Sequence, residues 1–195
     1  MRITNFRQLA VTTALCFSPA LVQAHVLSGD PTGLHHGFIH PFSGLDHLLA
    51  MVAVGLWAAQ QGGRSLWTIP AAFVGLMSLG GAVGMLGGSL PGVEGVIAAS
   101  VLVFGLLIAC SARFEQRWSL PLVGAFALFH GFAHGREMPA SASGVSYAAG
   151  FILATIALHG LGVLAGLGFQ QIRRSQGLRW IGAGMAAASV WIYLG

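Results

Sequence analysis

The stretch His40-Pro41-Phe42-Ser43-Gly44-Leu45-Asp46-His47-Leu48-Leu49-Ala50-Met51 organises the chain, because metal-ligand side chains run here directly into an apolar segment. Pro41 and Gly44 are expected to break the backbone just before that segment becomes a helix. His40, Asp46 and His47 then fall within two helical turns, and positions seven apart share a helix face. The pattern predicts either a site for a borderline divalent cation or an Asp–His pair that only joins two helices.

The composition excludes an ordinary soluble domain. Of the 195 residues, 55% are hydrophobic and only 7% are charged, whereas soluble domains carry about a quarter charged residues. All nine basic residues are arginines, and the net charge of +4 fits membrane orientation better than nucleic-acid binding, so no nucleic-acid partner is expected. Cys16 and Cys110 are too few for a disulfide framework or a thiolate metal site.

Residues 1–24 are expected to form a cleavable signal peptide. Arg2 and Arg7 supply a positive start, residues 9–17 an apolar core and residues 22–24 a small-residue cleavage site. Cleavage would expose His25 as the mature amino terminus, where its amine and imidazole form a chelating pair. His25 is therefore a candidate metal ligand, and an ordinary histidine-containing linker is the alternative.

Six apolar runs follow, each near the ~20 residues needed to cross a bilayer. They cover residues 42–61, 66–88, 92–110, 119–136, 143–168 and 178–194. The breaks between them are short, so residues 25–195 are predicted to form a single permease domain. Glycines recur at four-residue spacing, which lets helix backbones approach closely: Gly80, Gly84 and Gly88, and then Gly162 and Gly166. The expected fold class is an all-α membrane protein, a six-transmembrane-helix bundle after a cleavable signal peptide.

The arginines predict how the bundle is oriented. A signal peptide would leave residue 25 outside the cytoplasmic membrane, and six crossings would leave only Arg136 on that side. The cytoplasmic side would then collect Arg64, Arg113, Arg117, Arg173, Arg174 and Arg179. Such an excess is typical of cytoplasmic loops. The expected location is the bacterial cytoplasmic membrane, with several crossings and a periplasmic mature amino terminus.

A second cluster occurs in His130-Gly131-Phe132-Ala133-His134-Gly135-Arg136-Glu137. His130, His134 and Glu137 stand at four- and seven-residue offsets, so one helix face presents all three. Two histidines at this spacing commonly hold a divalent metal, although the spacing alone is a weak motif. A lone membrane histidine is more often a hydrogen-bonded core residue, but two histidines and an acid on one face favour a ligand role.

The predicted orientation brings both clusters to the outer side of the membrane. Glu94, at the outer end of the third predicted helix, joins them as a further candidate ligand. His130 lies deeper than His134, toward the middle of the membrane. His159 lies deeper still. It is expected either to bind the ion later on the transport pathway or to form a hydrogen bond that packs two helices together.

These motifs resemble the HupE/UreJ family of nickel and cobalt transporters. The resemblance rests on His40-Pro41, Gly44, Asp46-His47 and Met51 and on His130-Gly131-x-x-His134-Gly135-x-Glu137, and it extends over the chain through the leader, the His25 start and six spans. It implies that the following residues are needed for metal passage: His40, Asp46, His47, His130, His134 and Glu137. Glu94 is a weaker candidate by the same resemblance.

The function expected from the sequence is that of an inner-membrane permease rather than an enzyme. It would take up Ni²⁺ or Co²⁺ from the periplasm by facilitated diffusion through a His/carboxylate site. The metal ion would be the cargo, no permanent cofactor is expected, and the lipid bilayer is the other partner. The alternative is a membrane-bound histidine-box metalloenzyme, whose boxes would face the cytoplasm rather than outward. A structural or assembly subunit without metal dependence is the third possibility.

Overall fold

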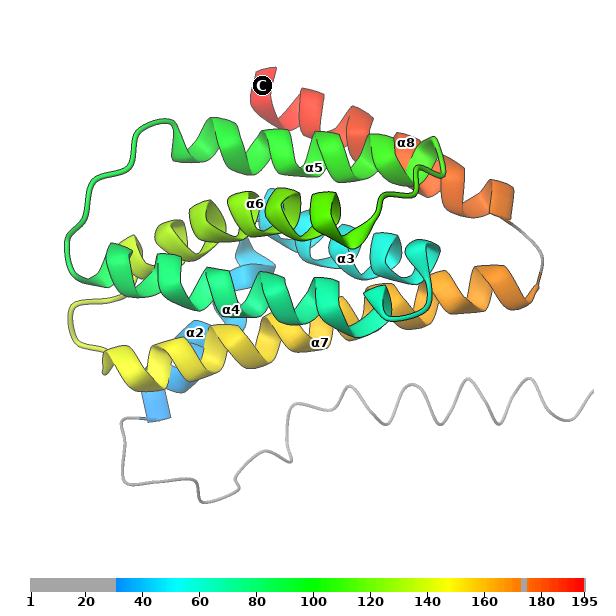
Figure 1. Ribbon diagram of the computed structural model, residues 1–195. Helices are drawn as coiled ribbons and strands as arrows, with labels where there is room; N and C mark the ends of the chain where they lie inside the picture. The colour runs from blue at the N-terminus through cyan, green and yellow to red at the C-terminus, as the bar shows by residue number, and fades with distance from the viewer. Residues whose placement is uncertain (1–30, 173–174, 195) are drawn as a thin grey trace, which may run out of the picture.

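The computed structural model describes residues 31–172 and 175–194, which form seven helices and no strands (Figure 1). Six of these helices match the six predicted apolar runs, and their ends agree with the prediction within three residues. They are α3 (Leu45–Gln61), α4 (Ser65–Met85), α5 (Val93–Ala109), α6 (Gln116–Arg136), α7 (Gly144–Gln171) and α8 (Ser175–Leu194). The predicted signal peptide and His25 lie outside the described residues.

Length and composition make two of these helices candidate membrane spans. They are α4, with 21 residues, and α7, with 28. The bent pair of α2 (Pro31–Ser43) and α3 would add a third if the pair were one broken span. The all-helical, membrane-type architecture is therefore confirmed, while six crossings remain a prediction.

Helix α2 corrects the prediction made for the start of the chain. Residues 31–41 precede the first predicted apolar run, yet residues 31–43 are helical, with Pro41 inside the helix. The break falls at Gly44, which is extended (φ −106°, ψ 121°), and α3 leaves it at 85° to α2. His40 therefore does not share a helix face with Asp46 and His47, and that expectation is wrong. The proline weakens the last turn of α2, and the chain turns three residues later.

Glycines set the distance between paired helices, as their spacing predicted. A Cβ atom on Gly131 would collide with the carbonyl of Met77, and one on Gly135 with the carbonyl of Gly81, so α6 touches the backbone of α4. Each glycine directly follows a histidine of the second motif. The close approach is confirmed for Gly80, Gly84, Gly162 and Gly166, whereas Gly88 lies beyond the end of α4.

Large apolar side chains lie on the outside of the bundle as well as inside it. Trp67, Leu86 and Val145 are 78%, 88% and 82% exposed, while Trp57 and Phe104 are fully buried. An all-helical protein that is apolar on its outer face fits a lipid surround better than water.

Candidate metal site

The two sequence motifs meet at one end of the bundle. A cavity of about 210 Å³ opens there, where the bend between α2 and α3 faces the start of α5 and the end of α6. Its lining residues are His40, Ser43, Gly44, Asp46, His47, Glu94 and Glu137. Three of them are carboxylic acids, and no lysine or arginine is among them, so the cavity favours a cation.

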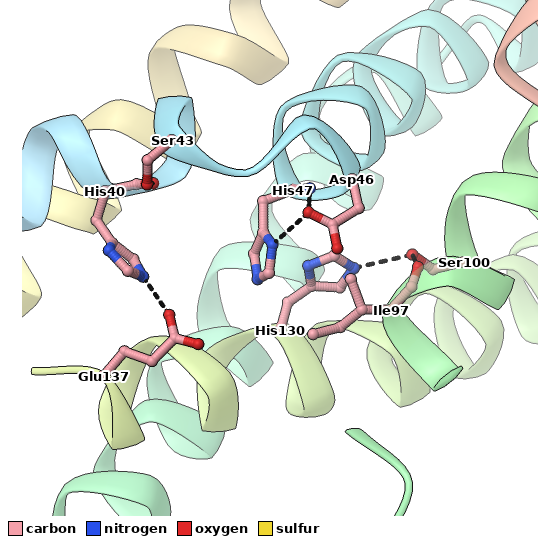
Figure 2. Close-up of polar contacts among 8 residues, drawn as sticks. All are labelled: His40, Ser43, Asp46, His47, Ile97, Ser100, His130 and Glu137. Carbon is pink, nitrogen blue, oxygen red and sulfur yellow. Dashed lines mark hydrogen bonds and ion pairs between the residues drawn. The ribbon is translucent and has the colours of Figure 1, made fainter. Parts of the chain in front are cut away.

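Asp46 orients His47. Its Oδ1 atom accepts the backbone N–H of His47 at 2.7 Å and lies 2.9 Å from Nδ1 of the same residue (Figure 2). Since a carboxylate only accepts hydrogen bonds, Nδ1 carries the proton and Nε2 keeps the lone pair. Nε2 of His47 is buried and has no hydrogen-bond partner. Gly44 makes room for this pair, because a Cβ atom there would lie 2.8 Å from Oδ1 of Asp46.

His40 and Glu137 join the end of α2 to the end of α6. Nε2 of His40 donates to Oε2 of Glu137 at 2.6 Å (Figure 2). This hydrogen bond lowers the pKa of the Glu137 carboxyl below its ordinary value, so the group stays ionised at neutral pH. Both side chains are partly exposed at the cavity, at 24% for His40 and 49% for Glu137. They are therefore placed to meet an ion arriving from solvent.

Ser100 of α5 holds His130. The Ser100 hydroxyl donates its one proton to the carbonyl of Ile97 at 2.6 Å, so its oxygen accepts the Nε2–H of His130 at 2.8 Å (Figure 2). Both residues are fully buried. This arrangement leaves the lone pair on Nδ1 of His130, which has no partner. Ser100 thus selects the ring nitrogen of His130 that can bind a metal.

His134 is the third buried histidine at this end of the bundle. It is fully buried, and neither of its ring nitrogens has a hydrogen-bond partner. Its ring lies 4.8 Å from that of His47 and 5.0 Å from that of His40, measured between centroids, and it stacks on Phe151. The rings of His47 and His130 are also 5.0 Å apart. We call His47, His130 and His134 the buried histidine cluster.

The buried histidine cluster offers lone pairs beneath the carboxylates of the cavity. In the described part of the chain, no three histidine, cysteine or acidic side chains are already arranged to hold one ion. The histidine rings meet edge to face, so ring rotations would be needed to point their nitrogens at a common centre. Buried nitrogens without partners are costly. A borderline divalent cation would give these nitrogens a partner, because such an ion binds imidazole and carboxylate groups together.

The structure brings seven of the eight predicted ligands to this end of the bundle: His40, Asp46, His47, Glu94, His130, His134 and Glu137. Glu94 is exposed at the cavity, in the first turn of α5. Ser100 was not among the residues predicted from the sequence. The only feature of the sequence that marks it is a hydroxyl group within the apolar run 92–110. That signal is weak, because membrane helices often carry a serine bonded to their own backbone.

Comparisons with known proteins match most of the chain. A sequence model of the family described as HupE / UreJ protein matches residues 12–192. Protein HupE of Rhizobium leguminosarum bv. viciae is 45% identical over 167 residues, which cover 85% of this chain and 86% of that protein. No solved structure matches the chain.

Proposed function

Because the chain belongs to the HupE/UreJ family, which is associated with nickel and cobalt transport, we propose that it is a permease for Ni²⁺ or Co²⁺. The ion would be the cargo and not a resident cofactor. The chain would cross the bacterial cytoplasmic membrane six times, with the cavity at the periplasmic side and the arginine-rich loops in the cytoplasm.

One observation carries this proposal: buried imidazole nitrogens without partners lie directly beneath a cavity lined by carboxylates. Nε2 of His47, Nδ1 of His130 and both nitrogens of His134 are the atoms concerned. The carboxylates would attract a hydrated cation, and the imidazoles would then replace part of its water shell. Imidazole and carboxylate, without thiolate, suit an ion that must also leave, because a transport site has to bind loosely enough to release.

Facilitated diffusion would be sufficient for uptake. A membrane potential contributes ~2.3 kcal/mol per charge per 100 mV, hence ~4.6 kcal/mol for a divalent cation moving inward. The carboxylates at the cavity would raise the local concentration of cations, and the membrane potential would drive the cations inward.

Purified protein in liposomes tests the proposal. With no ATP present, an inside-negative potential alone should accelerate the accumulation of Ni²⁺ or Co²⁺, and a pH gradient at zero potential should add little. A metalloenzyme would bind the metal without transporting it. A structural subunit would neither bind nor transport it. Accumulation that requires a pH gradient or a partner ATPase would contradict facilitated diffusion, and no accumulation under any gradient would contradict the permease.

A further inference from the structure

His159 is a buried histidine that the outer site does not use. It lies within α7 and is 2% exposed. Its Nδ1 atom lies 2.8 Å from the backbone carbonyl of Met51 in α3. A carbonyl only accepts, so Nδ1 carries the proton and Nε2 keeps the lone pair. That Nε2 atom is buried and has no partner.

A helix-packing role would explain only half of this side chain. The hydrogen bond to Met51 needs the Nδ1–H group alone, and it leaves an acceptor buried without a donor. Such a group costs stability unless something binds it. The orphaned nitrogen of His159 therefore repeats the feature that marks the buried histidine cluster.

The ring of Phe73 in α4 links His159 to that cluster. Phe73 lies 5.0 Å from the ring of His159 and 5.7 Å from the ring of His130, measured between centroids. One turn along both helices, the hydroxyl of Thr155 donates to the thioether sulfur of Met77 at 3.6 Å. All of these side chains are buried. An oxygen and a sulfur atom, which can also bind a metal, therefore lie between α4 and α7 one helical turn from His159.

We propose that His159 Nε2 forms a second, inner site for the same divalent cation, which the ion occupies after it leaves the buried histidine cluster. This inference rests on the proposed permease function. His159, Thr155 and Met77 carry no carboxylate, whereas the outer cavity carries three. The ion is therefore held less tightly at the inner site, which suits release toward the cytoplasm, since conduction needs several sites of moderate affinity.

Two substitutions separate the two nitrogens of His159. His159→Asn keeps an amide donor near the position of Nδ1 and removes Nε2, whereas His159→Gln places an amide group near the position of Nε2. Leu158→Ala is the matched packing control, because Leu158 is also 2% exposed and neighbours His159 in α7. The proteins are reconstituted in liposomes that enclose a fluorescent chelator. Co²⁺ absorption reports binding at the outer cluster, and the chelator reports passage.

His159→Asn should retain the Co²⁺ absorption of the outer cluster and lose passage by about tenfold or more. His159→Gln should pass more Co²⁺ than His159→Asn, and Leu158→Ala should pass it at the wild-type rate despite a lower Tm. In wild-type protein with ¹⁵N-labelled histidine, Zn²⁺ should shift the Nε2 resonance of His159.

Equal passage by wild type and His159→Asn would overturn the inner site alone, and so would an unshifted Nε2 resonance or an equal loss of passage in Leu158→Ala. Failure of the wild type to pass either Co²⁺ or Ni²⁺ would instead overturn the proposed function.

Discussion

Nε2 of His40 lies 2.6 Å from a carboxylate oxygen of Glu137, although the two residues are 97 positions apart in the sequence. This contact closes one side of the cavity by joining α2 to the end of α6. It also places one residue of each sequence motif in direct contact.

Glu137→Gln should make the stability of the purified protein less sensitive to acid. The hydrogen bond from His40 lowers the pKa of Glu137 from its ordinary value of 4.5. The carboxylate therefore contributes stability that is present above this pH and is lost as the pH falls through the lowered pKa. Glutamine does not titrate, so the Tm of the wild type in detergent should fall more steeply on acidification than that of the variant.

The matched control for this measurement is Glu115→Gln. Glu115 forms an exposed ion pair with Arg117, and such surface pairs contribute little to stability. The control should keep the wild-type dependence of Tm on pH. An identical dependence in Glu137→Gln and the wild type would remove the His40 contact as a source of stability.

Asp46→Asn should lower metal uptake by about tenfold or more while the protein is inserted at normal levels. Asparagine can still accept the hydrogen bonds from His47, so the ring orientation is kept. What is lost is the negative charge that offsets a divalent cation. Uptake of radioactive Ni²⁺ or Co²⁺ by cells, normalised to protein in the membrane, measures the effect. Normal uptake by the variant would exclude Asp46 from the site.

His47→Ala and His134→Ala should each abolish most transport, and the double variant should lose little more. Their rings are 4.8 Å apart, and residues that bind one ion act as a unit. Initial rates in liposomes provide the double-mutant cycle. Losses that multiply would instead indicate two independent sites.

Ser100→Ala should weaken metal binding by about 10- to 100-fold, as the loss of a group that positions a ligand does. Without the serine oxygen, the Nε2–H of His130 has no acceptor and the ring proton can move to Nδ1. Titration with Co²⁺ measures the affinity, and ¹⁵N NMR of the histidine rings identifies the protonated nitrogen.

Ser189→Ala is the control for the loss of a buried serine. Ser189 is 2% exposed and donates to the carbonyl of Ala98 at 2.6 Å, so its removal costs a similar hydrogen bond between helices. The control should keep the affinity of the wild type. Unchanged affinity and an unchanged His130 tautomer in Ser100→Ala would disprove the positioning role.

Gly44→Ala should reduce uptake without unfolding the protein. A Cβ atom at this position would lie 2.8 Å from Oδ1 of Asp46 and 3.2 Å from Nδ1 of His47, so the pair must move. Gly75→Ala is the control, because a Cβ atom there meets nothing within 4 Å. Uptake and Tm are measured for both variants. If Gly44→Ala transports as well as Gly75→Ala, the space at Gly44 is not needed.

The sequence by itself determined the helices and most of the candidate ligands. Runs of apolar residues predicted the ends of the six helices α3 to α8 within three residues, because helix length and hydrophobicity are local properties. The spacing of His130 and His134 placed both on one face of α6 for the same reason. The break expected at Gly44 is confirmed, whereas the break expected at Pro41 is wrong, because Pro41 lies inside α2.

Only the tertiary structure decided which side chains meet across helices. The contacts of Ser100 with His130 and of His159 with Met51 join residues 30 and 108 positions apart. Helices that are apolar all round, such as α4 and α7, do not reveal from their sequence which face turns inward. The tautomers of His130 and His159, and with them the nitrogens free to bind a metal, follow from those long-range contacts, because a hydrogen bond to one ring nitrogen determines where the lone pair remains.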